Sequence, residues 1–166
     1  NLSRIAGSFS SFAKLPDSKQ EEVEVCKVLS SVVTLFENSN DKTEIRFEPS
    51  KEELIVLADR EQLIQVFNNI LKNAQQAIPS YKKGIIEVAI QKEGEKVLIS
   101  VADNGKGIDK KVREKLFMPN FTTKSTGMGL GLAISKNIIQ LMGGDIRFET
   151  ELDVGTEFTI ELPLKN

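Results

Sequence analysis

The sequence predicts an α/β fold, a two-layer α+β sandwich with about five strands in a mixed, mostly antiparallel sheet and three main helices on one face. Segments with helical periodicity alternate with pairs of strand-length apolar segments along the chain. The chain has 166 residues, 40% of them hydrophobic, which is enough for one buried core. Helices alternating with strand pairs favour a sheet covered by helices on one side.

Helices are expected where apolar residues recur at helical spacing: Leu2–Leu15, Val25–Phe36, Asp59–Ile78, Lys110–Phe117 and Leu130–Leu141. Pro16 ends the first of them. Asp59, with Gln62 three residues later, resembles a capping box, and Pro79 ends that helix. Gly143-Gly144 is a glycine stop for the last helix.

Strands are expected where apolar residues alternate or run together over short lengths: Thr43–Glu48, Leu54–Ala58, Ile85–Ile90, Val97–Ala102, Asp145–Thr150 and Gly155–Leu162. The first two are separated by Pro49-Ser50-Lys51 and are expected to form a hairpin. The next two should pair around Glu93-Gly94. The charged stretch Asp17–Glu22 is expected to be a linker, so that residues 1–22 precede a main domain of residues 23–166.

Composition excludes several classes of function. The net charge is −2, from 22 basic and 24 acidic residues, so the overall balance does not point to nucleic acid or to an anionic membrane surface. No apolar run approaches the roughly 18 residues needed to cross a bilayer. With no histidine and one cysteine, Cys26, the chain lacks the residues for a zinc site or a histidine-based triad. Cys26 is expected to be a small buried apolar residue.

Two asparagines lie four residues apart on one flank of the Asp59–Ile78 helix. At about 100° per residue, Asn69 and Asn73 project on the same side of its apolar face, with Gln62 and Gln76 beside them. Side-chain amide oxygens are neutral ligands for Mg²⁺, and the amide nitrogens can donate to phosphate. A magnesium or phosphate site and a plain solvated helix edge are both open for this pair.

The string Asp103-Asn104-Gly105-Lys106-Gly107-Ile108 directly follows an expected strand. Asn-Gly pairs are typical of hairpin turns, but no second strand follows this one. The glycines let the backbone pass close to a flat ligand, and the Asp103 carboxylate can accept a hydrogen bond from the exocyclic amine of adenine. The string therefore indicates either a nucleotide loop or an ordinary turn.

Residues 121–132, FTTKSTGMGLGL, contain three glycines that lead straight into a helix. In such an arrangement free backbone N–H groups and the helix dipole can bind phosphate, and Lys124 adds a cation. The string matches neither the dinucleotide fingerprint nor the Walker pattern. Glycines needed only for lid movement or helix packing are the structural alternative. Gly155-Thr156-Glu157-Phe158 is ordinary strand sequence when taken alone.

Taken in order, NNILKNA, DNGKGI, LFMPNFTTK, GMGLGLA and GTEF resemble the asparagine box, first glycine box, phenylalanine box, second glycine box and third glycine motif of sensor histidine kinases. The resemblance covers about residues 25–164, and TTKSTGMGLGLA is similar to kinases of the nitrogen-regulation type. It implies the Bergerat ATP-binding fold, with ATP and Mg²⁺ between the long helix and a mobile lid at about residues 106–129. Phe117 and Phe121 would anchor that lid.

The resemblance also implies roles for individual residues. Asn73 would coordinate the Mg²⁺ that bridges the phosphates, and Asn69 would support the phosphates or the attacking group. Asp103 would bind the adenine amine, and Thr156 would hold adenine through water. Lys124 would bind the β- and γ-phosphates and share the catalytic role with the two asparagines. The other nucleotide-binding residues would belong to the two glycine-rich loops: Gly105, Gly107, Ile108, Ser125, Thr126, Gly127, Met128, Gly129, Leu130 and Gly131.

Two departures from the family pattern bear on activity. Gln76 stands where many members carry a lysine, so Lys124 would supply more of the charge on the phosphates. The chain has no histidine, and Asn1–Leu15 resembles the tail of the second helix of the hairpin that carries the phosphoacceptor histidine in the family. We therefore expect a cytoplasmic fragment that binds ATP without phosphorylating itself on histidine, and that contacts neither nucleic acid nor membrane.

The implied parent is a homodimer, in the cytoplasm or anchored in the inner membrane. It would transfer the γ-phosphoryl group to its hairpin histidine and then to an aspartate of a response regulator. Two alternatives are open. Other branches of the superfamily include anti-sigma serine kinases, ninety-kilodalton heat-shock chaperones, and topoisomerase or mismatch-repair ATPases; those that hydrolyse ATP themselves use a glutamate where Asn69 stands. A non-catalytic nucleotide-sensing or docking module is disfavoured by the presence of Asn73, Asp103 and Lys124.

Overall fold

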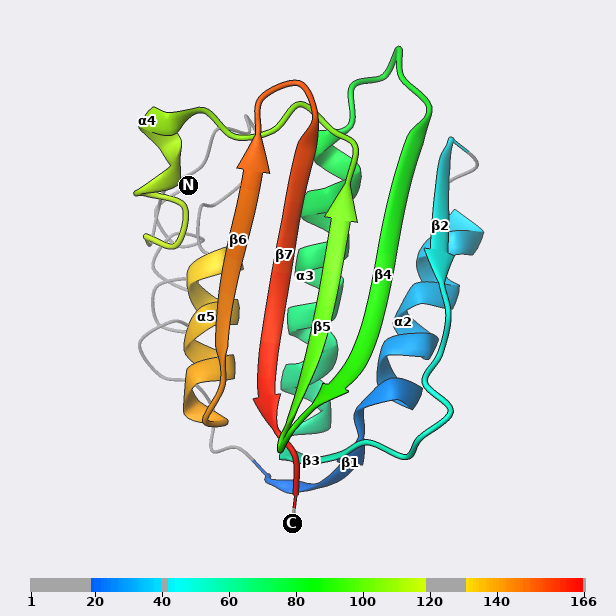
Figure 1. Ribbon diagram of the computed structural model, residues 1–166, viewed down its shortest axis with the longest axis vertical. Helices are drawn as coiled ribbons and strands as arrows, with labels where there is room; N and C mark the ends of the chain where they lie inside the picture. Colours follow the sequence, from blue (N-terminus) through cyan, green and yellow to red (C-terminus); the bar gives the residue numbers. More distant parts are fainter. Residues whose placement is uncertain (1–18, 40–41, 119–130, 166) are drawn as a thin grey trace, which may run out of the picture.

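A computed structural model of the chain describes residues 19–39, 42–118 and 131–165. The elements in these ranges are, in order, β1 (Glu21–Glu24), α2 (Val25–Ser39), β2 (Thr43–Phe47), β3 (Ile55–Ala58), α3 (Arg60–Ala77), β4 (Gly84–Glu93), β5 (Lys96–Asp103), α4 (Lys110–Arg113), α5 (Gly131–Leu141), β6 (Asp145–Glu151) and β7 (Gly155–Pro163). Helices α2, α3 and α5 lie side by side on one face of a sheet (Figure 1). The predicted two-layer α/β fold is confirmed.

The main sheet has five strands in the order β2-β4-β5-β7-β6. Strand β2 pairs in parallel with β4, and the other neighbours are antiparallel. Burial alternates along β5, where Val97, Ile99 and Val101 face the helices and are at most 3% exposed. Such alternation arises because only one face of the sheet is covered. The predicted mixed, mostly antiparallel sheet is therefore confirmed.

The expected hairpin between Thr43–Glu48 and Leu54–Ala58 is wrong. The first segment forms β2 at an edge of the main sheet, whereas the second forms β3 and pairs antiparallel with β1 in a separate two-stranded sheet. The connection, residues 48–54, is much longer than the two-residue turns that close tight hairpins. It leads β3 to the lower end of the molecule in Figure 1, where Leu54, Val56 and Ala58 are buried.

Helix α3 is the central helix of the helical layer, between α2 and α5 (Figure 1). The Asp59 side chain caps it by accepting a hydrogen bond from the backbone N–H of Gln62 at 3.2 Å, as the capping pattern predicted. Its apolar face is fully buried against the sheet and the neighbouring helices: Leu63, Val66, Phe67, Ile70, Leu71 and Ala74. The helix ends at Ala77, one residue before the predicted boundary and two before Pro79.

The helix expected at Leu2–Leu15 lies outside the described residues. Helix α4 ends at Arg113 rather than at Phe117, and turns follow it. Helix α5 begins at Gly131 and ends before Gly143, whose φ of +87° suits a glycine stop. Cys26 is 4% exposed, as expected, and its sulfur accepts a hydrogen bond from the backbone N–H of Ser50. None of the helices that the structure describes is long and apolar enough to cross a membrane.

The two ends of the described chain meet at the lower end of the molecule. The backbone N–H of Lys165 donates to the carbonyl of Ile55 in β3 at 2.8 Å, and its ammonium group pairs with Glu22 of β1. Strand β1 takes in the last two residues of the expected linker. The backbone N–H of Lys19 donates to Asp59, the carboxylate that also caps α3. The segment leading into the domain is thus tied to both its last strand and its central helix.

Candidate functional site

Asp103 occupies the last position of β5, at the upper end of the sheet in Figure 1. It is 8% exposed, and its Oδ1 accepts a hydrogen bond from the backbone N–H of Gly105 at 2.8 Å. Burial raises the pKa of the Asp103 carboxyl, while hydrogen bonds from the backbone amides of Gly105 and Thr156 oppose that rise. A carboxylate so depleted of water is a strong acceptor for a ligand N–H group.

The two glycines after Asp103 let the loop lie directly on neighbouring backbone. A side chain at Gly105 would collide with the carbonyl of Ala77, and one at Gly107 with the backbone of Glu151. The backbone N–H of Lys106 donates to the same Ala77 carbonyl at 3.0 Å. The loop is therefore fixed to the C-terminal end of α3, one helical turn beyond Asn73.

Thr156 lies beside this loop on β7 and is 5% exposed. Its hydroxyl is 2.9 Å from that of Thr150, and the Thr150 hydroxyl also accepts the backbone N–H of Ile108 at 2.9 Å. Thr150 thus joins two predicted site residues that are far apart in sequence. It was not predicted as a site residue, although it lies opposite Thr156 in the β6–β7 register and a correct hairpin register would have indicated it.

Asn69 and Asn73 are both half-buried on the flank of α3. The side-chain nitrogen of Asn73 donates to the backbone carbonyl of Asn69 at 2.8 Å. The side-chain nitrogen of Asn69 donates to the hydroxyl of Ser135 on α5 at 3.1 Å, and Ser135 is 1% exposed. Each amide is thus fixed by one hydrogen bond from its nitrogen to another group of the protein.

Gly131, the first residue of α5, lies against Asn69. An ideal Cβ at this position would be 2.5 Å from Oδ1 of Asn69 and 3.0 Å from its Cγ. The glycine therefore provides the space that the Asn69 amide occupies. Ser135 and Gly131 together hold this amide from one side, and sequence patterns alone gave no reason to single out Ser135.

The donor set at α3 fits magnesium through Asn73 in particular. Its side-chain nitrogen is engaged by a carbonyl, and its oxygen is the kind of neutral hard ligand that Mg²⁺ accepts. Within the described ranges, no group of three or more His, Cys, Asp and Glu residues could hold a metal ion. A magnesium ion at this position would thus draw its other ligands from phosphate oxygens and water, as is usual for this metal.

Phe117, predicted as a lid anchor, lies in an aromatic cluster with Phe148 and Phe158. Its ring centroid is 5.8 Å from that of Phe148 and 6.5 Å from that of Phe158, and the ammonium of Lys136 lies 4.5 Å from its centre. Such geometry is favourable for aromatic and cation–π pairs. The remaining predicted lid and phosphate-binding residues lie outside the described residues: Phe121, Lys124, Ser125, Thr126, Gly127, Met128, Gly129 and Leu130.

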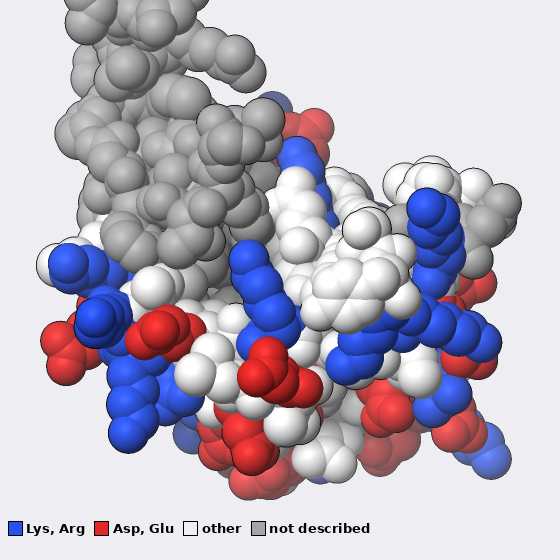
Figure 2. All heavy atoms as spheres, turned by 90° about the horizontal axis from the view of Figure 1, so that it is seen from above, with Lys and Arg blue, Asp and Glu red and all other residues white. Residues whose placement is uncertain are grey.

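Seen from above, the end of the molecule that carries these loops mixes positive and negative side chains around uncharged surface (Figure 2). A shallow depression of about 530 Å³ crosses α3 and α2 and includes Asn69, but it reaches neither Asn73 nor Asp103. The candidate site is instead the region where α3, the start of α5 and the 103–108 loop converge.

Comparison with known proteins gives consistent results. The sequence profile of the family described as histidine kinase-, DNA gyrase B- and HSP90-like ATPase matches residues 58–166. The signal transduction histidine-protein kinase AtoS of Escherichia coli (strain K12) is 34% identical over 166 residues, which cover 99% of this chain and 27% of AtoS. The chain spans about a quarter of the length of such curated relatives.

Solved structures are similar over most of the chain. The nucleotide-free catalytic domain of the histidine kinase ThkA aligns with a TM-score of 0.78 and 34% identity, covering 87% of this chain and 95% of that one. ThkA in complex with the response regulator TrrA aligns with a TM-score of 0.77 and 30% identity, over 99% and 48%. Full-length ShkA in complex with AMPPNP aligns with a TM-score of 0.82 and 27% identity, over 99% and 36%.

Proposed function

Since this chain belongs to the family of histidine kinase-, DNA gyrase B- and HSP90-like ATPases, in its sensor histidine kinase branch, we propose that it binds MgATP and serves phosphoryl transfer in its full-length parent. A histidine imidazole nitrogen on a dimerisation domain would attack the γ-phosphorus. The bond to the β–γ bridging oxygen would break, and ADP would leave. The phosphoryl group would then pass to an aspartate oxygen of a response regulator.

The observation that carries this proposal is the buried Asp103 carboxylate in a loop attached to α3, the helix that carries Asn73. The exocyclic amine of adenine would donate to Asp103, and Thr156 would assist through water. Asn73 precedes Ala77, on which the loop rests, by about 6 Å along α3. The base and the phosphates of one nucleotide would thus be bound at two positions of a single rigid element, with Gly105, Gly107 and Ile108 lining the base.

Asn69 would act on the attacking group. One N–H of its side-chain amide donates to Ser135, which fixes the amide, and the side-chain oxygen can accept from an incoming N–H group or water. An amide is not a base, so this contribution would be orientation. Phosphoryl transfer relies mainly on such positioning and on neutralisation of charge.

When bound, Mg²⁺ would neutralise charge on the phosphates. Asn73 would hold it through the side-chain oxygen. Lys124 and the backbone amides of residues 125–131 would complete the phosphate site from the lid. Gln76 is exposed beside this site and carries no charge, so Lys124 would carry most of the cationic contribution.

The direct test is calorimetric titration of this chain with ADP and ATP, for the wild type and Asp103→Asn. The side-chain amide introduced by Asp103→Asn would either place its NH₂ group against the amine of adenine, donor against donor, or accept from that amine with an uncharged oxygen. A hydrogen bond to a charged acceptor is worth roughly 1.5–3 kcal/mol, so the affinity should fall by about 10- to 150-fold. An affinity within about twofold of the wild type would refute the adenine role.

Transfer is tested separately, in trans. The chain is mixed with radiolabelled ATP and a separate histidine-bearing hairpin domain of its parent, and the hairpin should become labelled. Wild-type ATP binding without any labelling would favour the non-catalytic alternative. Labelling that Asn69→Ala leaves unchanged would contradict the orienting role of Asn69.

A further inference from the structure

We propose that Asn104 is a positioning residue that sets purine specificity by holding the Asp103 carboxylate in place. The proposal rests on the adenine role given to Asp103 above. It assigns Asn104 a function of its own within DNGKGI, where sequence patterns had explained it only as a turn residue.

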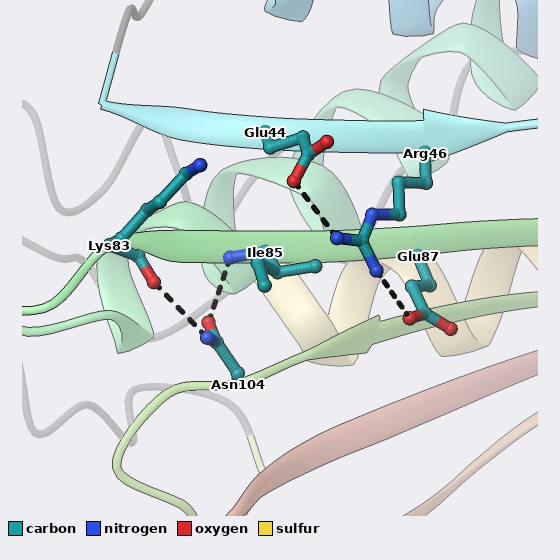
Figure 3. Close-up of polar contacts among 6 residues, drawn as sticks. All are labelled: Glu44, Arg46, Lys83, Ile85, Glu87 and Asn104. Carbon is teal, nitrogen blue, oxygen red and sulfur yellow. Dashed lines mark hydrogen bonds and ion pairs between the residues drawn. The ribbon is translucent and has the colours of Figure 1, made fainter.

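The side chain of Asn104 makes two hydrogen bonds to the start of β4 (Figure 3). Its Oδ1 accepts the backbone N–H of Ile85 at 2.9 Å, and its Nδ2 donates to the carbonyl of Lys83 at 3.1 Å. The backbone N–H of Asn104 also donates to the carbonyl of Ile85 at 3.2 Å. The acceptor and the donor of one side-chain amide are thus matched to backbone groups of two residues on either side of Gly84.

These bonds begin where the strand ladder ends. The last pair in the β4–β5 register is Ile86 with Asp103. One residue later the Asn104 side chain takes the place of a further strand residue and keeps the chain on the β4 side. The contribution to the core is small, because Asn104 is only half-buried and Nδ2 bonds to an exposed carbonyl. Its effect is therefore on the path of the loop.

The path of the loop determines the orientation of the carboxylate. Asn104 lies between Asp103 and Gly105, and the Gly105 N–H holds Oδ1 of Asp103 at 2.8 Å. The other attachments of the loop come later in the chain, where Lys106 bonds to Ala77 and Ile108 to Thr150. Among the described contacts, Asn104 alone ties the loop to β4. Loss of the Asn104 side chain would leave the backbone bond of Asn104 to Ile85 and the Thr156 amide on Asp103. It would remove both side-chain bonds that fix the peptide between Asp103 and Gly105, so the carboxylate would be held less firmly.

A fixed carboxylate distinguishes purines by the group at position 6. The amine of adenine donates to it, whereas the oxygen of hypoxanthine would meet the carboxylate lone pairs. Such discrimination is large only when the acceptor cannot move away from the wrong base. A mobile Asp103 would bind ADP more weakly and IDP nearly as before, so the ratio of the two affinities is the diagnostic quantity.

The test is calorimetric titration of this chain with ADP and with IDP, for wild type, Asn104→Ala and Asp103→Asn. We expect Asn104→Ala to reduce the ADP-over-IDP preference by roughly tenfold, the effect of one misplaced charged hydrogen bond. Arg46→Ala is the matched control. Arg46 pairs with Glu44 and Glu87 on β2 and β4 at 3.1 and 3.5 Å, near Asn104 but without contact to the loop (Figure 3). Its removal should leave the ratio unchanged.

The outcomes are distinguishable. Equal loss of ADP and IDP affinity in Asn104→Ala would mean a purely structural role and would overturn the proposal, as would an unchanged ratio. A ratio that survives Asp103→Asn would instead overturn the adenine role of Asp103 itself. If Asn104→Ala does not fold, Asn104→Asp decides the question. It keeps the acceptor for Ile85 but cannot donate to Lys83, so a wild-type ratio in that variant would count against positioning.

Discussion

Substituting Gly131 with alanine should uncouple Asn69 from α5 while leaving the fold in place. The new Cβ would lie 2.5 Å from Oδ1 of Asn69, nearly 1 Å closer than an ordinary contact, so the flexible side chain must rotate away. Rotation breaks its hydrogen bond to Ser135, a loss of about 0.5–1.5 kcal/mol. Alanine within a helix is favoured over glycine by roughly 0.5–1 kcal/mol. The two terms nearly cancel, and the free energy of unfolding should change by less than about 1 kcal/mol.

Phosphoryl transfer to the separate hairpin should respond much more than stability. Alanine keeps the backbone N–H at position 131, so a reduced rate would reflect the displaced Asn69 amide rather than a missing phosphate donor. Losing one orienting hydrogen bond should reduce the rate by about tenfold. The assay is labelling of the hairpin in trans, combined with urea unfolding of the same variants.

A double-mutant cycle with Ser135→Ala gives the decisive result. Both substitutions act through the same amide, so the double variant should be little worse than either single one. In an Asn69→Ala background, Gly131→Ala should have no further effect on the rate. Additive losses, or destabilisation of Gly131→Ala by more than about 2 kcal/mol, would show that the clash is not relieved through Asn69 and would refute the reasoning.

Three further predictions concern other positions. Asn73→Ala should lose the Mg²⁺-dependent part of nucleotide affinity, measured by titrations with and without the metal, and an unaltered metal dependence would contradict the ligand role. Asp59→Ala should lower the free energy of unfolding by about 1 kcal/mol at neutral pH, measured in urea. The hydrogen bond from the Lys19 backbone lowers the pKa of Asp59. The stability that the ionised carboxylate contributes is therefore fully present above the ordinary pKa of 3.8 and is lost as pH falls through the lower folded-state pKa. If Asp59→Ala remained less stable than the wild type in acid, the capping role would be contradicted. Burial raises the pKa of Asp103, so the nucleotide-free wild type should lose stability as pH rises from the ordinary value of 3.8 through the folded-state pKa. Asp103→Asn should remove this pH dependence. Parallel curves of unfolding free energy against pH for the wild type and the variant would disprove the prediction.

Local patterns were sufficient to predict most of the fold. Helix α3 was found almost to the residue, because its cap, its apolar face and its terminating proline all act within one helix length. The expected hairpin failed because strand pairing is not local. Nothing in Thr43–Glu48 indicates that its partner is β4, about 40 residues later, and the pairing of β3 with β1 crosses the whole of α2.

In the candidate site, too, local sequence patterns indicated some residues and missed others. Asp103, Asn69 and Asn73 were identified because residue type and spacing carry their chemistry. Ser135 contacts Asn69 from α5, and Thr150 contacts Ile108 and Thr156 from β6. Asn104 follows Asp103 directly, but the partners of its side chain lie about 20 residues earlier in the chain. A serine inside a helix or a threonine in a strand has no distinctive pattern. Only the three-dimensional arrangement reveals which of them touches a site residue.

The junction of Lys165 with β1 and β3 has a consequence for how this domain can be built into larger proteins. The described part of the chain begins and ends at one corner, near Lys19 and Lys165, while the 103–108 loop lies at the opposite end of the sheet (Figure 1). Neighbouring domains attached at that corner would leave the loop uncovered. Adjacent termini also tolerate circular permutation. New ends placed in the exposed turn at Gly94, with Lys165 joined to the segment before Glu21, should therefore yield a domain with the same sheet order.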